Sequence, residues 1–307
     1  MFSARTLLSL YALITVVAIV LFSGLGTEEA APPPTYTPNK TYKITLLQTN
    51  DVQLEKYHSS NSLMMDERKK QIDAIKSQVE HKGGKTILLS GGDISASIEY
   101  AERSHLNDLN YTAMTVGLHQ FDSSLEDIRK QQKRAHFPLL SANIFGSETG
   151  RPLFDAYKLV NIDGLTLAII GVTEKYTPKP KNRKNLTGID IIDPYEVVSE
   201  LAPLLKRQAD IVIVSTHLGH NPAKESRLSM QSLESIEGVD LVLGGHVYQA
   251  SEKGQENHPD SCGRYLTQVD LEFRNGKLKI ISDKQMATNK LFNDRQAVVQ
   301  PLISKAN

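Results

Sequence analysis

The chain has 307 residues, of which 40% are hydrophobic, so it can bury a substantial core as one large domain or two small ones. The chain has 35 lysine and arginine residues and 35 aspartate and glutamate residues. This balance excludes a net positive charge that would attract the chain to a nucleic-acid polymer or an anionic membrane surface. The single cysteine, Cys262, excludes an intrachain disulfide.

An apolar run from Leu7 to Gly26 follows Arg5 and precedes a polar, proline-rich stretch. The run is longer than the roughly 7–15 residues of a signal-peptide core and close to the roughly 18–20 that span a bilayer, which favours an uncleaved membrane anchor. Gly24 and Gly26 also fit a small-residue cleavage site, so a removed signal peptide stays open as the alternative. In both cases we expect export: an anchored protein facing the periplasm or cell exterior, or a periplasmic or secreted one. The predicted division is 1–26 as signal or anchor, 27–39 as proline-rich linker and 40–307 as one domain.

From Lys43 onward, short apolar segments rich in β-branched or aliphatic residues recur along the chain. Several are bounded by glycine, asparagine or aspartate, which is typical of buried strands. The segments are "KITLLQTND", "KTILLSGGD", "AMTVGLH", "FPLLSAN", "LTLAIIGVT", "ADIVIVSTH" and "VDLVLGGH".

Helical patterns lie between these predicted strands. Residues 62–80 place an apolar set near one helix face, namely Leu63, Ile72, Ile75 and Val79. In "DPYEVVSELAPLLKRQ", Asp193 is expected to cap the helix and Pro194 to be its first residue. Strands that alternate with helices predict an α/β domain.

Two hairpin signals interrupt this alternation. One is Asp163-Gly164 and the other is Asn275-Gly276, each between two apolar runs. The strands on either side of each turn must be antiparallel. Mixed sheets, or two sheets packed face to face between helices, therefore fit better than a purely parallel doubly wound fold.

Each of five apolar runs ends in a residue that can bind a metal ion or transfer a proton. The five are Asp51, Asp93, His119, His217 and His246. Ligands of open α/β sheets bind beyond the carboxyl ends of the strands, so we expect these side chains to converge there. Carboxylates and imidazoles in one place form a metal-ligand set.

These segments resemble the calcineurin-like metallophosphoesterases. In particular, "NYTAMTVGLHQFD", "PLLSANI", "VSTHLGH" and "VDLVLGGHVY" are similar to the catalytic domain of bacterial 5'-nucleotidases, and the resemblance runs from about Ile44 to about Phe273. It implies an α/β/β/α four-layer sandwich of two mixed sheets flanked by helices. It also implies one or two divalent ions, Mn, Zn or Fe, and a phosphate-ester or nucleotide ligand.

The motifs of that family are D-x-H, G-D, G-N-H-E-F-D, a histidine after a strand, and G-H-x-H. By resemblance, His119 is the catalytic histidine and Asp122 the acid that orients it. The retained metal ligands are Asp51, Asp93, His217 and His246. Three other ligand positions are occupied by Gln53, Leu118 and Tyr248 instead of histidine, asparagine and histidine.

Two functions stay open at this point. The retained residues predict a metal-dependent hydrolase of phosphate esters. The lost ligands predict a non-catalytic protein of the same fold that binds a ligand or a protein partner, since Leu118 has no lone pair to offer a metal. His58, in the loop after Asp51, is either a replacement ligand or, more commonly for such a residue, a solvent-exposed histidine.

Overall fold

In the computed structural model, the structure describes residues 35–52, 61–94, 106–175, 186–218, 230–244, 265–287 and 303–305. The predicted signal or anchor, residues 1–26, lies outside these ranges, and the division of the chain into 1–26, 27–39 and 40–307 stays a prediction. Among the described residues, no helix combines the length and the apolar character needed to cross a membrane.

The described strands form two large mixed sheets and one small ladder. The first sheet has the order β12 (Lys277–Ala287), β11 (Tyr265–Arg274), β1 (Tyr42–Thr49), β2 (Lys85–Ser90), β3 (Ala113–Thr115) and β4 (Leu139–Leu140). The second has the order β13 (Ile303–Lys305), β10 (Leu241–Leu243), β9 (Ile211–His217), β7 (Leu165–Thr173) and β6 (Tyr157–Ile162). The ladder pairs β5 (Ile144–Gly146) with β8 (Ile189–Ile191).

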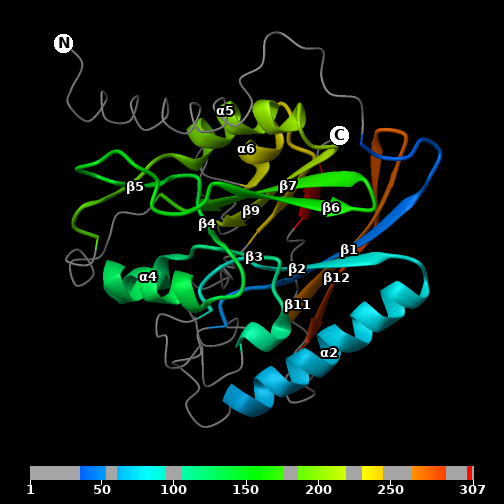
Figure 1. Ribbon diagram of the computed structural model, residues 1–307, viewed down its shortest axis with the longest axis horizontal. Coiled ribbons are helices and arrows are strands. Elements are labelled where there is room, and N and C mark those ends of the chain that lie inside the picture. The colour runs from blue at the N-terminus through cyan, green and yellow to red at the C-terminus, as the bar shows by residue number, and fades with distance from the viewer. Residues whose placement is uncertain are drawn as a thin grey trace, which may run out of the picture.

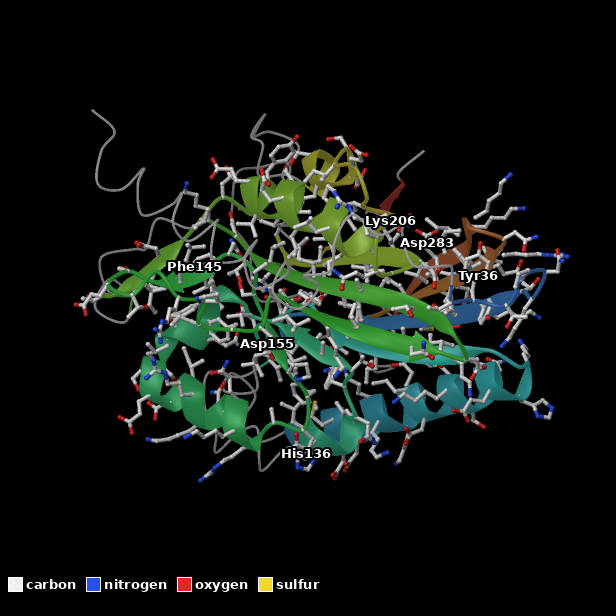
Figure 2. All side chains as sticks on the ribbon, turned by 45° about the horizontal axis from the view of Figure 1, so that its top comes forward. Tyr36, His136, Phe145, Asp155, Lys206 and Asp283 are labelled. Atoms are coloured by element: carbon white, nitrogen blue, oxygen red, sulfur yellow. The ribbon has the colours of Figure 1, made fainter. Side chains whose placement is uncertain are left out.

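The helices cover the outer face of each sheet. Those of the described chain are α2 (Asn61–His81), α4 (Leu125–Arg134), α5 (Pro194–Lys206) and α6 (Met230–Glu234), with short 3-10 helices η2 (Leu106–Leu109) and η3 (Leu118–Asp122). In Figure 1, α5 and α6 lie above the second sheet and α2 and α4 lie below the first. Lys206 at the end of α5 and His136 just after α4 accordingly lie on opposite outer sides (Figure 2).

Three buried apolar clusters fill the spaces between these layers. One packs α5 and α6 against β7, β9 and β10, and another packs α2 and α4 against β1, β2 and β3. The third lies between the sheets and takes alternate residues from their facing sides, such as Ile44, Leu46, Ile169 and Ile213. Because buried apolar side chains fill the space between each two adjacent helix or sheet layers, the structure confirms the predicted α/β/β/α sandwich.

Local sequence signals explain several element boundaries. Asp193 accepts a hydrogen bond from the backbone N–H of Tyr195 (2.9 Å), so it caps α5, and Pro194 is the first helical residue, as predicted. Both hairpin turns also form as predicted. Asp163 and Asn275 have φ values of 52° and 50°, and the glycine after each is also left-handed, which matches the type I′ hairpin turn.

Residues 35–39, at the end of the predicted linker, pack against the domain. The rings of Tyr36 and Phe273 pack edge-on with centroids 5.1 Å apart. The backbone N–H of Asn39 donates to Asn275 Oδ1 in the β11–β12 turn (2.8 Å). Thr35 Oγ1 donates to Asp210 Oδ2 (3.3 Å). These contacts fix the start of the described chain beside the amino ends of the β7 and β9 strands.

Gly171 of β7 in the second sheet packs directly against Leu140 of β4 in the first sheet. A Cβ atom added there would overlap the Leu140 side chain and lie 2.6 Å from the Leu140 carbonyl oxygen. We expect Gly171→Ala to lower the free energy of unfolding by about 3 kcal/mol, because the backbone at Leu140 cannot move aside cheaply. At Gly188, φ is +80° and nothing lies within 4 Å, so Gly188→Ala should cost only about 1 kcal/mol of backbone strain. Urea unfolding of both variants tests this, and equal costs would contradict it.

Candidate metal centre and active site

The layer between the sheets changes from apolar to polar at the carboxyl ends of the strands. Thr115 on β3 donates its hydroxyl hydrogen to Ser215 Oγ on β9 (2.7 Å), and Thr173 on β7 donates to the Val116 carbonyl (2.7 Å). These side chains follow apolar residues on the same inward face, because alternate residues of a strand share a face. The sheets are therefore hydrogen-bonded to each other directly beneath the site.

Asp51 and Asp93 lie just beyond β1 and β2 in neighbouring loops. Both have left-handed backbone conformations, with φ values of 48° and 53°, which aspartate tolerates better than most residues. The Asp51 N–H donates to the Gly92 carbonyl (3.1 Å), and the Gly91 N–H donates to the Thr49 carbonyl (2.9 Å). The loops hold each other, so the two carboxylates are placed by backbone contacts.

Asp51, Asp93 and His217 form a buried cluster. One potential ligand atom from each lies within 4.8 Å of the others. His217 Nε2 is 2.8 Å from Asp93 Oδ2, and its Nδ1 donates to the Gly91 carbonyl (2.7 Å). Burial by itself lowers the pKa of His217, but the charges of Asp93 and Asp51 and the hydrogen bonds to Asp93 and Gly91 raise it to about 10. Without an ion, the neighbouring carboxylates favour the charged form of the imidazole.

The same cluster fits a divalent cation. The Nδ1 hydrogen bond to a backbone carbonyl leaves Nε2 to face the carboxylates, which is the usual arrangement of a metal-binding histidine. Two carboxylates and one imidazole are donors suited to Mn, Zn or Fe. These three residues would hold the cation, and its positive charge would offset the charge of the two carboxylates.

Two glycines allow this close packing. Gly92 has a φ of +111°, and an added Cβ would lie 2.6 Å from His217 Nδ1. An added Cβ on Gly117 would overlap Asp93 Oδ1. The glycines beside the predicted ligands are therefore needed because side chains would fill the space that the cluster occupies.

His119 and Asp122 form a pair at the rim of the cluster. Both belong to η3, where His119 Nδ1 lies 2.7 Å from Asp122 Oδ2, and their side chains are 44% and 41% exposed. The His119 N–H donates to Asp93 Oδ1 (2.8 Å). If Asp122 accepts the Nδ1 hydrogen, it fixes the tautomer and the orientation of the His119 ring. The predicted catalytic pair is thus tied to the predicted metal ligand Asp93.

Leu118, the first residue of η3, lies between Gly117 and His119 and is partly buried. It follows Gly117, which lies against Asp93, and its side chain has no atom that binds a metal. That it occupies a lost ligand position stays a prediction. Four other predicted or candidate residues lie outside the described part of the chain, namely Gln53, His58, His246 and Tyr248. Their assignments stay predictions.

Gln48 was not among the predicted site residues, although it lies at the polar end of the inward face of β1. Its Nε2 donates to the Gly244 carbonyl (2.6 Å) and to Asn50 Oδ1 (2.8 Å). Gln48 follows Ile44 and Leu46 on the inward face of β1, so the period of two along the strand was the available signal. It ties β1 to the end of β10.

Relatives in sequence include proteins named 5'-nucleotidase and UshA. The chain is 30% identical to a 5'-nucleotidase from Vibrio cholerae, over 90% of this chain and 57% of the relative. It is 32% identical to protein UshA from Salmonella pullorum, over 89% of this chain and 56% of the relative. The chain thus spans little more than half the length of the curated relatives it matches. No protein-family profile matches it.

Solved structures share the fold. A calcineurin-like phosphoesterase from Bacillus subtilis, YfkN, has a TM-score of 0.61 and 21% identity, covering 81% of this chain and 92% of that one. A 5'-nucleotidase-like structure from Staphylococcus aureus has a TM-score of 0.62 and 17% identity, covering 85% of this chain and 56% of that one. At these identities the likeness concerns the fold alone.

The buried ion pair predicts a stability difference between two similar substitutions. Asp93→Asn removes the charge that faces the buried His217 imidazolium, and we expect it to lower the free energy of unfolding by about 3–5 kcal/mol in metal-free protein. Asp122→Asn alters a half-exposed pair with a histidine and should cost about 0–1 kcal/mol. Urea unfolding at neutral pH with a chelator measures both. Similar costs for the two variants would show that the buried pair does not form.

Proposed function

Because the chain belongs to the 5'-nucleotidase family of calcineurin-like metallophosphoesterases, we propose that it is a metal-dependent hydrolase of phosphate esters. Nucleotides are the proposed substrate class, on the strength of the relatives' names. The observation that carries the proposal is the position of Asp93. One of its oxygens lies 2.8 Å from His217 Nε2, and the other accepts the His119 N–H at 2.8 Å.

The residues divide into two groups by their surroundings. Asp51, Asp93 and His217 are buried and would hold a divalent cation. Such a cation, when bound, neutralises charge on phosphoryl oxygens and makes a water molecule more acidic. His119 lies at the exposed rim, where a substrate can reach it, and Asp122 fixes the orientation of its ring. In this position His119 would donate a proton or a hydrogen bond at the leaving oxygen.

A second function is favoured by one observation. Leu118 occupies a ligand position of the family's G-N-H-E-F-D motif and offers no donor atom. A non-catalytic protein that binds a ligand or a protein partner through the same cleft would need the fold and not the complete metal centre. Metal content separates the two proposals, because a hydrolase of this type requires bound cations.

We also propose export, with Leu7–Gly26 as a membrane anchor or a cleaved signal. Support comes from the length of that apolar run and from Arg5 before it. Fractionation of cells that express the full chain would test this, since recovery in the cytosol would contradict it.

The test of the hydrolase begins with elemental analysis of the full-length chain after growth with manganese, zinc and iron. A screen of nucleoside 5'-monophosphates and nitrophenyl phosphate esters follows. Turnover that a chelator abolishes would support the hydrolase. Metal content near zero together with absent turnover would favour the non-catalytic protein.

His119→Ala should reduce kcat by about 10²–10⁴-fold, because the group that donates at the leaving oxygen is lost. Its cation binding should stay near the wild-type level, since the His119 side chain is outside the buried cluster. His136→Ala is the matched control, because His136 is an exposed histidine on an outer layer (Figure 2). Unchanged turnover in His119→Ala would rule out this role for His119.

Leu118→Asn restores a side-chain oxygen at the lost ligand position. We expect Mn²⁺ to bind about tenfold more tightly, a gain of ~1.4 kcal/mol. Leu118→Ala, which removes the apolar bulk without adding a donor, should not reproduce this gain. Calorimetric titration of the metal-free proteins distinguishes the two variants. Equal Mn²⁺ affinities would mean that residue 118 does not face the cation.

A further inference from the structure

Gln120 is a fully buried polar residue in the turn that carries His119. Its Oε1 accepts hydrogen bonds from the backbone N–H groups of Gly117 (2.8 Å) and Asp93 (3.4 Å). The second of these links η3 to a loop 27 residues earlier in the chain. One side-chain oxygen therefore holds both segments that frame the cluster.

The two segments are bonded in both directions. Gln120 of η3 accepts from the Asp93 backbone, while the Asp93 carboxylate accepts from the His119 backbone (2.8 Å). Gly117 lies so close to Asp93 that an added Cβ would overlap the carboxylate. With this little space, a shift of Gln120 must move either Asp93 or the turn that carries His119.

The residue type at this position also matters. The G-N-H-E-F-D motif has glutamate where this chain has Gln120. An amide oxygen accepts the same two hydrogen bonds without a charge. Among the described residues, Asp51 and Asp93 are two buried carboxylates that lie beside the imidazole of His217. A third buried carboxylate would add negative charge that bound cations would balance.

We propose that Gln120 is a positioning residue that sets the Asp93 carboxylate against His119. We infer further that its uncharged amide avoids the loss of stability that a glutamate would cause when the site holds fewer cations than the family's full ligand set would bind. This inference rests on the proposed function. The position of the Gln120 side chain can nevertheless be tested without measuring turnover.

Three variants of the full-length chain test the positioning role. Gln120→Met keeps the side-chain length and removes the acceptor, whereas Gln120→Glu keeps the acceptor and adds charge. Gln268→Met is the matched control, because Gln268 is also a buried glutamine but donates to Asp270 on its own strand. The informative signal is amide hydrogen exchange at His119, whose N–H bonds to the Asp93 carboxylate.

In metal-free protein, Gln120→Met should speed exchange at His119 at least about tenfold, as well as at Gly117 and Asp93. A purely local role would affect Gly117 and Asp93 and leave His119 protected. Gln120→Glu and Gln268→Met should both keep the His119 amide protected. Unchanged exchange at His119 in Gln120→Met would overturn the positioning role.

The charge is tested by thermal unfolding and by Mn²⁺ titration. In chelator, Gln120→Glu should have a Tm lower by about 2–4 °C than wild type, and added Mn²⁺ should close the gap. Gln120→Met should bind Mn²⁺ about 10–100-fold more weakly than Gln120→Glu. A Gln120→Glu protein as stable as wild type in chelator would overturn the inference about charge.

These measurements test the role of Gln120 whether or not the proposed function is correct. If wild type hydrolyses no phosphate ester, the hydrolase proposal falls, while exchange at His119 and the Tm in chelator still decide the role of Gln120. If turnover is present and Gln120→Met leaves exchange at His119 unchanged, only the positioning role falls.

Discussion

The contact between Asp93 and His217 is the interaction on which the site depends. Asp93 belongs to the loop after β2 in the first sheet, and His217 ends β9 in the second, so their 2.8 Å contact joins the two halves of the sandwich. Both side chains are buried, and either charge alone would be costly there. The Gly91 carbonyl accepts the Nδ1 hydrogen of His217, and Gly92 and Gly117 leave the space that the two side chains occupy.

A gradient of polarity along the strands makes such a contact compatible with a stable core. On the inward faces, residues such as Ile213 belong to the apolar cluster, and the next inward residues of β9 are Ser215 and His217. Hydrogen bonds between the sheets, from Thr115 to Ser215 and from Thr173 to Val116, satisfy the polar side chains just below the site. The core therefore ends in a bonded polar layer, and the cluster rests on it.

Three consecutive residues of η3, 118–120, differ in what they can contribute to the site. His119 keeps its bond to Asp122 and its backbone link to Asp93, and both contacts need only the local geometry of η3 and its neighbouring loop. Leu118, one residue earlier, offers no donor atom at a position where the family resemblance predicts a metal ligand. Gln120, one residue later, is uncharged and accepts two backbone hydrogen bonds. The turn therefore combines a formed His–Asp pair with two side chains that bring no charge to the site.

Features that depend on neighbours along the chain could be predicted from the amino-acid sequence. The Asp193 cap with Pro194, the hairpins at Asp163 and Asn275, and the placement of Asp51, Asp93 and His217 at strand ends all follow from local patterns. The helix α4, capped by Ser124, and the β5–β8 ladder were not predicted. Three contacts are visible only in the folded structure: Gln120 is buried and accepts from the Asp93 backbone, Gln48 donates to Gly244, and His217 pairs with Asp93. Their partners come from distant segments, and no local periodicity encodes which distant backbone group a buried amide or imidazole will meet.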